Sequence, residues 1–358
     1  MELSFHWILF ICSCAYFLMK VLLTGAFGNV GQRTLELLLK KGYSVRCFDL
    51  RNPRNVQIET RMRKLGIFET VWGDIRDSKT TLRIVKDVDA IIHLAAIIPP
   101  LAYEKQALAY DVNVKGSINL LRAAENMKKP PRFVYVSSIA VHGNRMNKEP
   151  PTRVDDPLNP LDYDNYAKHK IEVEKEIWKS TIPWIILRFA AVTPYEMAWK
   201  IPDLMYEVPL EQRIELVDSR DAGLACVNAL NADVVGKILF IGGGKGNQLY
   251  QKEFVSKMLE VLSIGMLPDN AFKPVDSIED YYHCDWMNTT EAQKLLNFQR
   301  YTFDDFLKEF KKKVSFRRFV VKLFKPLVRA ILLEKSPYYT KNQKKRTKYK
   351  TRGKPTLT

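Results

Sequence analysis

The stretch VLLTGAFGNVG, residues 21–31, joins an apolar run to three glycines, Gly25, Gly28 and Gly31, ahead of an expected helix at residues 29–41. Glycine at such a turn lets backbone N–H groups approach a pyrophosphate at the positive end of a helix, and lets helix and strand pack closely. The stretch therefore predicts a dinucleotide-binding turn. A glycine-rich turn without a ligand is the alternative, and the surrounding sequence has to decide between them.

Short apolar runs alternate with helix-like runs after this turn. Strands are expected at residues 21–24, 44–49, 70–72, 90–94 and 133–138, and further helix at 107–127. This alternation predicts an α/β protein with a Rossmann-like, doubly wound parallel sheet. We expect the cofactor-binding domain to span residues 19–192 and a small C-terminal α+β substrate lobe to span 193–310, with residues 213–241 returning to the Rossmann core.

Asp49 ends the second expected strand, where a dinucleotide fold places an acid on the adenosine ribose hydroxyls. A carboxylate there repels the additional phosphate of NADP, so NAD is the expected cofactor. Arg46 and Arg51 lie nearby and leave NADP open as the less favoured alternative, because a guanidinium can accommodate a 2′-phosphate.

Tyr166 and Lys170 are four residues apart, downstream of Ser137 and Ser138. Residues at this spacing share one face of a helix, so the Lys170 ammonium is expected to favour the ionised Tyr166 phenol. A phenolate could remove the proton of a secondary alcohol, and a serine could stabilise the developing alkoxide. The pattern predicts a hydride-transfer site. An ordinary amphipathic helix would explain the tyrosine and lysine if they stood alone.

These motifs resemble the extended short-chain dehydrogenases/reductases of the NAD-dependent epimerase/dehydratase group, over roughly residues 19–310. Ser138 is chosen over Ser137 because Ser-Ile-Ala-Val-His-Gly resembles the family's Ser-x-x-Val-Tyr-Gly, with His142 in place of the usual tyrosine. The resemblance implies that Asn113 belongs to the active-site proton path. The expected catalytic residues are Ser138, Tyr166, Lys170 and Asn113.

The resemblance also supplies contacts to the cofactor. It implies that Asp74 in Gly-Asp-Ile meets the adenine, that the loop after His93 lies beside the cofactor, and that the backbone of Val192 meets the nicotinamide carboxamide. The expected cofactor-binding residues are Gly25, Phe27, Gly28, Asn29, Val30, Gly31, Asp49, Asp74, Ile75, Leu94, Ala95, Ala96, Tyr166, Lys170 and Val192.

The two residues after Ser138 limit which of the family's reactions is expected. Dehydratases of the family place an Asp-Glu pair after this position, whereas this chain has Ile139 and Ala140. The segment from Arg188 to Asp221 is shorter than the corresponding segment of most nucleotide-sugar epimerases of the family, so it offers less surface to bind a nucleotide diphosphate. This favours a small or apolar substrate: a sugar derivative, a uronate-like acid or a sterol-like alcohol. An NAD-dependent oxidoreductase is the leading hypothesis. A nucleotide-sugar epimerase that retains its NAD and a membrane-associated NAD-binding sensor or scaffold stay open.

Histidine and cysteine spacing predicts neither a metal site nor a disulfide framework. The five histidines lack metal-ligand spacing, and the five cysteines form no Cys-x-x-Cys motif. Reduced thiols and a cytoplasmic location are expected, peripheral to the inner face of the membrane if the C-terminal segment binds lipid. The family resemblance adds the expectation of a homodimer.

The net charge of +16 is concentrated at one end of the chain. Residues 311–358 carry 17 Lys and Arg against one acid, Glu334, while the remainder has equal numbers of basic and acidic residues. Residues 311–334 read as a basic amphipathic helix that suits an anionic membrane surface or docks on its own body, with a kink at Pro326. Residues 335–358 are expected to be disordered. No motif for specific nucleic-acid recognition accompanies this charge.

The N-terminal residues 1–18 form a largely apolar leader. The run is too short for a confident membrane span, which needs about 20 apolar residues, and no basic region marks a secretory signal. Met19-Lys20-Val21 is how a first strand of this kind begins at a natural start. A misassigned upstream extension, a disordered leader and a short membrane anchor all stay open.

Overall fold

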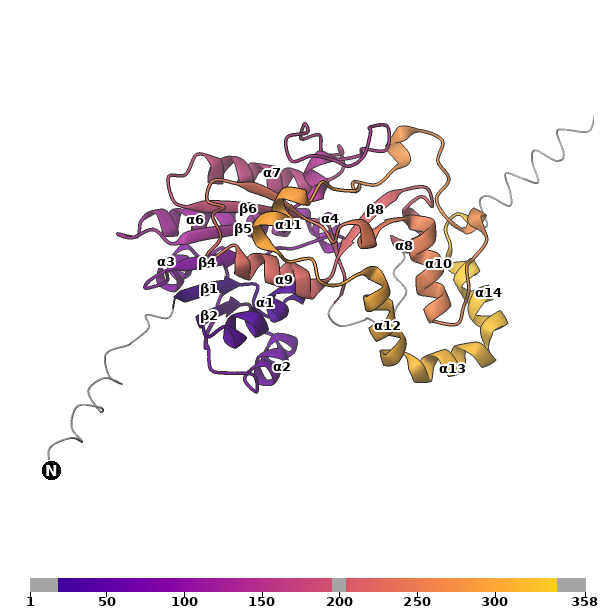
Figure 1. The fold of residues 1–358 in the computed structure, drawn as a ribbon, viewed down its shortest axis with the longest axis horizontal. Coiled ribbons are helices and arrows are strands. Elements are labelled where there is room, and N and C mark those ends of the chain that lie inside the picture. The colour runs from indigo at the N-terminus through magenta and orange to yellow at the C-terminus, as the bar shows by residue number, and fades with distance from the viewer. Residues whose placement is uncertain (1–18, 195–203, 340–358) are drawn as a thin grey trace, which may run out of the picture.

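A seven-stranded parallel sheet forms the larger part of the chain, in the order β3-β2-β1-β4-β5-β6-β9 (Figure 1). The computed structural model describes residues 19–194 and 204–339. The strands of this sheet are β1 (Lys20–Thr24), β2 (Ser44–Asp49), β3 (Glu69–Trp72), β4 (Ala90–His93), β5 (Arg132–Ser138), β6 (Trp184–Phe189) and β9 (Ile238–Ile241). The predicted Rossmann-like, doubly wound sheet is confirmed.

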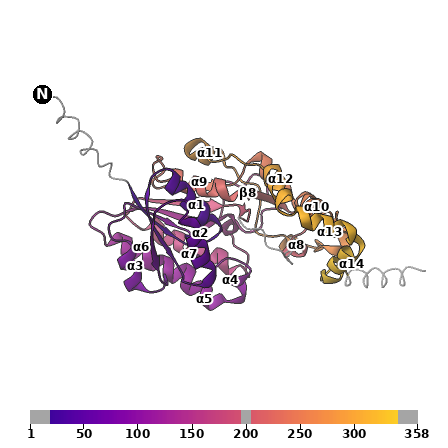
Figure 2. The same cartoon turned by 90° about the horizontal axis from the view of Figure 1, so that it is seen from below.

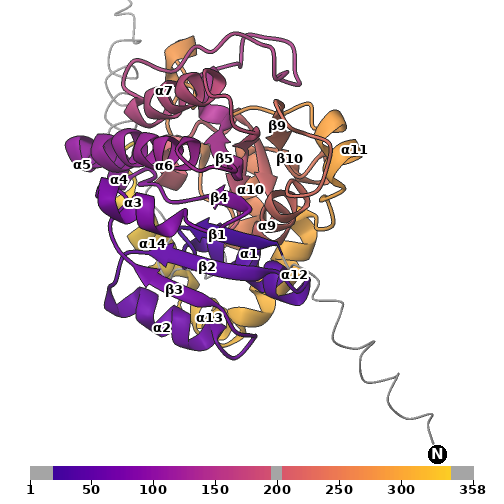
Figure 3. The same ribbon diagram turned by 90° about the vertical axis from the view of Figure 1, so that its left-hand side faces the viewer.

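Helices cover both faces of the sheet (Figure 3). One face carries α1 (Asn29–Lys40), α2 (Pro53–Met62) and α9 (Ser219–Asn228), and the other carries α3 (Ser78–Ile84), α6 (Ser117–Glu125) and α7 (Asn165–Trp178). Successive strand residues point to opposite faces, so Val21 and Leu23 pack with α1 and α9, while Leu22 packs with α6 and α7. The strands are apolar at most of their positions because both faces are covered.

The expected helix at residues 107–127 is divided in the structure. α4 (Leu101–Glu104) precedes α5 (Gln106–Tyr110), a π-helical turn follows at Asp111–Gly116, and α6 continues the path. α2, α3 and β6 were not among the expected elements. α2 and α3 begin at side-chain caps, where Asn52 accepts from Asn55 N and Asp77 accepts from Lys79 N. These caps were the available sequence signal.

The second lobe contains a separate three-stranded sheet in the order β10-β8-β7. Its strands are β7 (Ala191–Val192), β8 (Arg213–Val217) and β10 (Gln248–Tyr250), accompanied by α8 (Leu204–Glu207), α10 (Gln251–Val261) and α11 (Thr290–Leu296). Residues 213–241 were expected to return to the Rossmann core. β9 pairs with β6 in the main sheet and α9 packs in its core, whereas β8 pairs with β7 and β10. Ile214 and Leu216 of β8 pack in the second lobe and Val217 packs in the Rossmann core, and the expected domain boundaries stay a prediction.

Three further helices end the described chain: α12 (Phe303–Lys313), α13 (Ser315–Leu323) and α14 (Lys325–Lys335). The expected single helix with a kink at Pro326 is wrong. The breaks fall at Val314 and Phe324, and Pro326 lies in the first turn of α14, where a missing N–H is harmless. Residues 335–339 were placed in the expected disordered tail, but the structure describes them, and Ser336 is buried and donates to the Ala271 carbonyl.

Across residues 19–194 and 204–339, no helix is long and apolar enough to cross a membrane. Cys47, Cys226 and Cys284 are free and buried. The leader at residues 1–18 and the tail from residue 340 lie outside the described residues.

Glu215 of β8 is a buried carboxyl group at the centre of the second lobe. One of its oxygens accepts from Gly244 N at 3.0 Å, and the other accepts from Gln248 Nε2 at 2.9 Å and Met287 N at 2.7 Å. Burial raises the pKa of Glu215 from 4.5 to about 7 despite these three donors. The folded protein therefore holds a proton that an unfolded glutamate would release.

This proton makes the stability of the lobe depend on pH. The contribution of Glu215 to the free energy of unfolding is complete below pH 4.5 and is lost as the pH rises through about 7. The change is on the order of 3 kcal/mol. We expect denaturant titrations from pH 4.5 to 8 to show a fall in stability that Glu215→Gln reduces. The control is the same substitution at the exposed neighbour Glu211, Glu211→Gln. If the free energy of unfolding fell equally with pH in Glu215→Gln and in the native chain, Glu215 would not be the group responsible.

Candidate active site

The glycine turn lies at the carboxyl edge of the sheet, between β1 and β4, where the strand order reverses direction. Open α/β sheets bind ligands at this switch point. Gly25 has a φ of +66°, and a Cβ on it would lie 2.8 Å from Ala95 N. A Cβ on Gly31 would lie 2.1 Å from the Gly25 carbonyl oxygen. Both positions therefore require glycine, and together they form a cradle without side chains.

The first turn of α1 presents backbone donors to this cradle. Gly28 caps the helix without any side-chain acceptor. The Gln32 side chain donates to the carbonyls of Phe27 and Gly28, which fixes the turn from inside. Phe27 is fully buried with its ring against Trp72, so only its backbone faces the turn. A helix N-terminus with free N–H groups suits a phosphate.

Asp49 closes the turn from β2. One carboxylate oxygen accepts from Phe27 N at 2.9 Å, and the other accepts from Leu50 N at 2.8 Å and from Asn55 Nδ2 at 3.1 Å. Burial raises the pKa of this carboxyl group, and the two backbone donors act in the opposite direction. Each carboxylate oxygen can accept more than one hydrogen bond, so the group retains capacity for ribose hydroxyls.

Arg46 and Arg51, which left NADP as an alternative cofactor, lie in different surroundings. Arg46 is buried and donates to the carbonyls of Ile84 and Lys86, and it pairs with Glu69 at 2.9 Å. Arg46 therefore cannot turn to a 2′-phosphate. Arg51 is exposed just after β2.

Asp74 and Ile75 follow β3. Arg76 binds the Asp74 carboxylate through two guanidinium nitrogens and lowers its pKa. The Ile75 side chain is buried against Gly116 in the π-helical turn, so only the Ile75 backbone remains available to a ligand. A surface depression lined by Asp74, Arg76 and residues of the π-helical turn and α6 lies beside them.

A buried hydrogen-bond chain fixes the loop after β4. Ser117 Oγ donates to the Asn113 carbonyl at 2.6 Å, so His93 Nε2 must donate to Ser117 Oγ, 2.9 Å away. His93 Nδ1 is then an acceptor for the Thr24 hydroxyl at 2.7 Å, and Thr24 Oγ1 in turn accepts from Ala95 N. Burial lowers the pKa of His93 to about 3, which agrees with this neutral tautomer.

Asn113 holds the same loop by a second route. Its side-chain oxygen accepts from Ile97 N at 2.7 Å, and its amide nitrogen donates to Ile97 O at 2.8 Å. Asn113 is buried in the π-helical turn, a distortion that often occurs at functional sites. In this structure Asn113 positions Leu94, Ala95 and Ala96 beside the glycine turn, and its place in a proton path stays a prediction.

The three remaining catalytic candidates lie where α7 crosses the end of β5. Lys170 Nζ donates to the Val136 carbonyl at 2.7 Å, two residues before Ser138. The ammonium lies 5.6 Å from the centre of the Tyr166 ring and 4.8 Å from that of Tyr135. Ser138 Oγ accepts from Ala140 N at 3.2 Å, which leaves the Ser138 hydroxyl proton to donate to a ligand.

The electrostatics of Tyr166 differ from the expectation. Burial, with a further contribution from the Asp164 carboxylate, raises the pKa of Tyr166 above its ordinary value. Burial also lowers the pKa of Lys170 to about 8, against the attraction of Glu174. The Lys170 ammonium points to the Val136 carbonyl and not to the phenol, so protein groups alone do not produce the expected lowering of the Tyr166 pKa.

His142, which departs from the family motif, is a structural residue. Arg188 donates to His142 Nε2 at 3.0 Å and pairs with Glu174 of α7 at 2.7 Å. His142 Nδ1 therefore carries the proton and faces the Pro157 carbonyl at 3.3 Å. Burial lowers the pKa of His142 to about 4. Arg188 thus connects β6 with α7, and the neutral His142 ring connects Arg188 with the segment at Pro157.

Tyr103, Asp164 and His283 form a cluster that sequence reasoning missed. Asp164 caps α7 by accepting from Ala167 N, and its carboxylate also lies 3.2 Å from the Tyr103 hydroxyl and 2.8 Å from His283 Nδ1. Although burial acts in the opposite direction, these contacts lower the pKa of Asp164. Asp before a helix was a usable capping signal. The other two residues come from remote segments, which no sequence spacing links.

Five aromatic and methionine residues of the second lobe are candidates by residue type to line a substrate cleft or to fill the core: Tyr195, Met197, Trp199, Met205 and Tyr206. Tyr206 is buried in the core of the second lobe, and Met205 is partly buried against that core. Tyr195, Met197 and Trp199 lie outside the described residues. Val192 is partly buried in β7, and Asn29 Nδ2 donates to the Thr193 carbonyl beside it, which ties the glycine turn to this strand.

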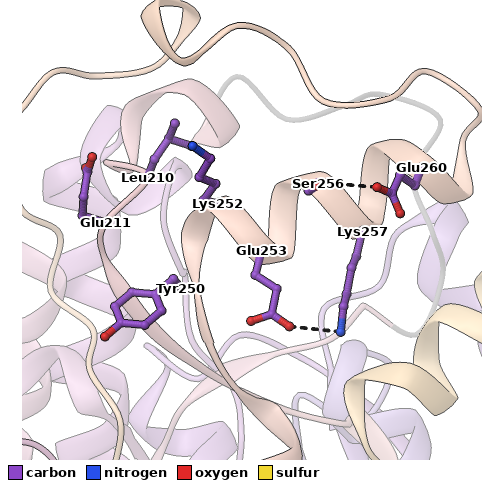
Figure 4. A pocket seen from close by; sticks show the side chains of 8 residues that line it. All are labelled: Leu210, Glu211, Tyr250, Lys252, Glu253, Ser256, Lys257 and Glu260. Atoms are coloured by element: carbon purple, nitrogen blue, oxygen red, sulfur yellow. Dashed lines mark hydrogen bonds and ion pairs between the residues drawn. The ribbon is translucent and has the colours of Figure 1, made fainter.

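A broad depression of about 640 Å³ lies on the second lobe beside α10 (Figure 4). Several of its polar side chains contact one another: Glu253 pairs with Lys257, and Ser256 donates to Glu260, as Figure 4 shows. It contains none of the predicted site residues. Within the described residues no group of three His, Cys, Asp or Glu side chains is placed to hold a metal ion.

A glycine cradle at the switch point of a parallel sheet defines a dinucleotide-binding protein of the Rossmann-like class. Residues 21–242 match the NAD dependent epimerase/dehydratase family, and the chain belongs to this family. The resemblance inferred from the motifs is confirmed, and with it the assignment to the NAD-dependent enzymes of the extended short-chain dehydrogenase/reductase type.

Individual relatives cover different activities. A UDP-glucose 4-epimerase of Lactobacillus helveticus is 33% identical over 162 residues, 44% of this chain and 46% of the relative. A 3-beta-hydroxysteroid dehydrogenase of Mycolicibacterium neoaurum is 34% identical over 127 residues, 34% of this chain and 32% of the relative. The chain thus spans only about a third to a half of the length of these curated relatives.

Solved structures share the fold over most of the chain. The UDP-glucose 4-epimerase of Thermotoga maritima with UDP-glucose superimposes with a TM-score of 0.69 at 20% identity, over 84% of this chain and 100% of that one. The dTDP-glucose 4,6-dehydratase of Bacillus anthracis in complex with NAD gives 0.68 at 21% identity, over 82% and 96%. Identity this low supports the fold and not the reaction.

Thr24→Val tests the hydrogen-bond chain behind the cradle. The substitution removes the donor to His93 Nδ1 and the acceptor for Ala95 N–H, so we expect a loss of about 1–3 kcal/mol in the free energy of unfolding, together with weaker NAD binding. Denaturant titration and NAD titration measure the two effects. The matched control is Thr34→Val, because the buried Thr34 hydroxyl donates only to Val30 O one turn earlier. Equal losses in both variants would refute the special role of Thr24.

Proposed function

We propose that this protein is an NAD-dependent oxidoreductase that transfers hydride between a secondary alcohol or its ketone and the nicotinamide. The observation that carries the proposal is the placement of Ser138, Tyr166 and Lys170 around the end of β5, beside a glycine cradle that fits a pyrophosphate. Bound NAD would supply the hydride acceptor. The backbone of residues 25–31 would hold its phosphates, and Asp49 its adenosine ribose.

Three side chains would act on the substrate and the cofactor. Ser138 would donate to the substrate oxygen, and Tyr166 would exchange its phenolic proton with that oxygen. Lys170 would hold the nicotinamide ribose and add positive charge near the phenol. Because burial raises the pKa of Tyr166 in the protein alone, the positive charge of the oxidised cofactor is the further contribution needed to form the phenolate.

Asp49 supports NAD over NADP. Its carboxylate would repel a 2′-phosphate, and Arg46 is already bound to two carbonyls and to Glu69. Dehydration is disfavoured because Ile139 and Ala140, which follow Ser138, are buried apolar residues without acid or base groups. We therefore infer simple oxidation or reduction of a small or apolar alcohol, such as a sugar derivative, a uronate-like acid or a sterol-like alcohol.

A homodimer packed through α6 and α7 is part of the same proposal, and sedimentation of the full chain as a monomer would remove it. Leu108 and Tyr110 of the adjoining α5 are exposed apolar residues on this side.

Tyr166→Phe tests the chemistry. We expect turnover to fall by about 10²–10⁴-fold, since one general acid–base group is removed, while NAD binding is retained. Steady-state rates on an alcohol panel, followed as NADH, and NAD titration measure the two properties. The control is Tyr110→Phe, which removes a phenol that contacts Glu172 of α7 from outside the site. Unchanged turnover in Tyr166→Phe would end the proposal.

An epimerase that retains NAD is the second candidate, supported by the similarity to UDP-glucose 4-epimerase. The state of the cofactor distinguishes the two, because an epimerase reduces and reoxidises the same NAD within one turnover. We expect denatured full-length protein to release little nucleotide, and the native chain to bind added NAD reversibly. Mass and absorbance of the released nucleotide provide the measurement. Retention of one NAD per chain would favour the epimerase.

A further inference from the structure

The helices α13 and α14 carry a series of exposed apolar side chains. Phe316 is 78% exposed, Phe319 64% and Leu323 62%. Their spacing of three and four residues places them, with Val320, on one side of α13, and the series continues along the chain through Phe324, Leu327 and Ile331. We call these seven residues the α13–α14 apolar face. Soluble monomers rarely expose large contiguous apolar patches without a partner.

This face does not arise from a helix detached from the body. Arg329 binds three carbonyls of the loop that follows α10, those of Ile264, Gly265 and Met266, at 2.8–3.1 Å. Tyr206 donates to the Leu332 carbonyl, and Leu332 is buried in the core of the second lobe. The inner side of α14 is therefore docked, and Val321 of α13 packs against the same core. The two helices lie beside α10 at the end of the second lobe (Figure 2).

The charge carried by this end of the chain is almost entirely positive, although Glu260 and Asp304 lie beside Arg318 of α13. The exposed lysines of this region are Lys311, Lys312, Lys313, Lys322, Lys325 and Lys335. Glu334 is the single acid between residues 311 and 358, and residues 340–358 add eight Lys and Arg to the sequence. An apolar face bordered by lysines matches the acyl boundary and the phosphates of an anionic bilayer.

We propose that the α13–α14 apolar face docks the protein peripherally on an anionic phospholipid membrane. The apolar side chains insert to a depth of about 5–10 Å, and the lysines contact the headgroups. The bilayer is favoured over a second copy of the chain, because a two-fold contact through this face would bring two sets of lysines together. The described helices are too short or too polar to span a bilayer, which agrees with surface docking.

This docking is independent of the proposed chemistry, and it places the second lobe at the membrane surface. α14 touches α8 through Tyr206 and Leu332, and Tyr338 donates to Glu207 at the end of α8. The lobe inferred to hold the substrate therefore lies directly behind the docked helices (Figures 1 and 2).

Vesicle co-sedimentation of the full chain tests the proposal. We expect binding to phosphatidylcholine vesicles that contain phosphatidylserine, weaker binding to pure phosphatidylcholine, and a decrease at high salt. The variant Phe316→Ser, Phe319→Ser, Leu323→Ser should bind at least about tenfold more weakly, since three apolar anchors are lost. Its unfolding midpoint should not change, because all three side chains are exposed.

The matched control is Leu65→Ser, Ile67→Ser, Leu82→Ser, which removes three exposed apolar residues from the Rossmann domain and should bind vesicles like the native chain. If the α13 variant misfolds, Lys322→Glu with Lys325→Glu provides the second test and should also lose binding. Native-like vesicle binding by the folded α13 variant would overturn the proposal. So would failure of the native chain to bind anionic vesicles, or a dimer in sedimentation that only the α13 variant abolishes.

Discussion

The close approach of three backbone segments at the switch point is the constraint on which the site depends. Gly25 lies against Ala95, and Gly31 lies against the carbonyl of Gly25, with no room for a Cβ at either contact. The strand order places the ends of β1 and β4 side by side, and the Thr24–His93–Ser117 chain fixes their distance. A phosphate can meet backbone N–H groups there because no side chain intervenes.

The catalytic candidates are held by buried polar contacts of α7. Glu174 forms an ion pair with Arg188 of β6, and Lys170 donates to the carbonyl of Val136 in β5. The helix is therefore anchored to two neighbouring strands. Asp164 caps the same helix and draws in Tyr103 and His283. This rigidity comes with a low-polarity setting that raises the pKa of Tyr166. In the proposed mechanism, reactivity therefore depends on the charge that the cofactor brings.

The second lobe differs from the Rossmann domain in the composition of its surface. The body of the chain is neutral, whereas its end is strongly basic and carries the α13–α14 apolar face. Arg329 shows that not every cation there is available to a partner, since this guanidinium binds three carbonyls of the loop that follows α10. The exposed lysines and apolar side chains are what remain for recognition, and they lie on the lobe inferred to bind substrate.

Local patterns in the sequence were enough to establish the parallel sheet, the glycine turn, the acid at the end of β2 and the family, because each rests on short-range spacing or on alternation along a strand. Tertiary contacts were needed to show that β8 leaves the main sheet, that Arg46 is occupied by carbonyls, and that Asp164 meets Tyr103 and His283. Those outcomes depend on contacts between segments far apart in the chain, which local patterns do not encode. The outward direction of Phe316 and Phe319 was likewise undetermined, since helical periodicity defines an apolar face but not what that face meets.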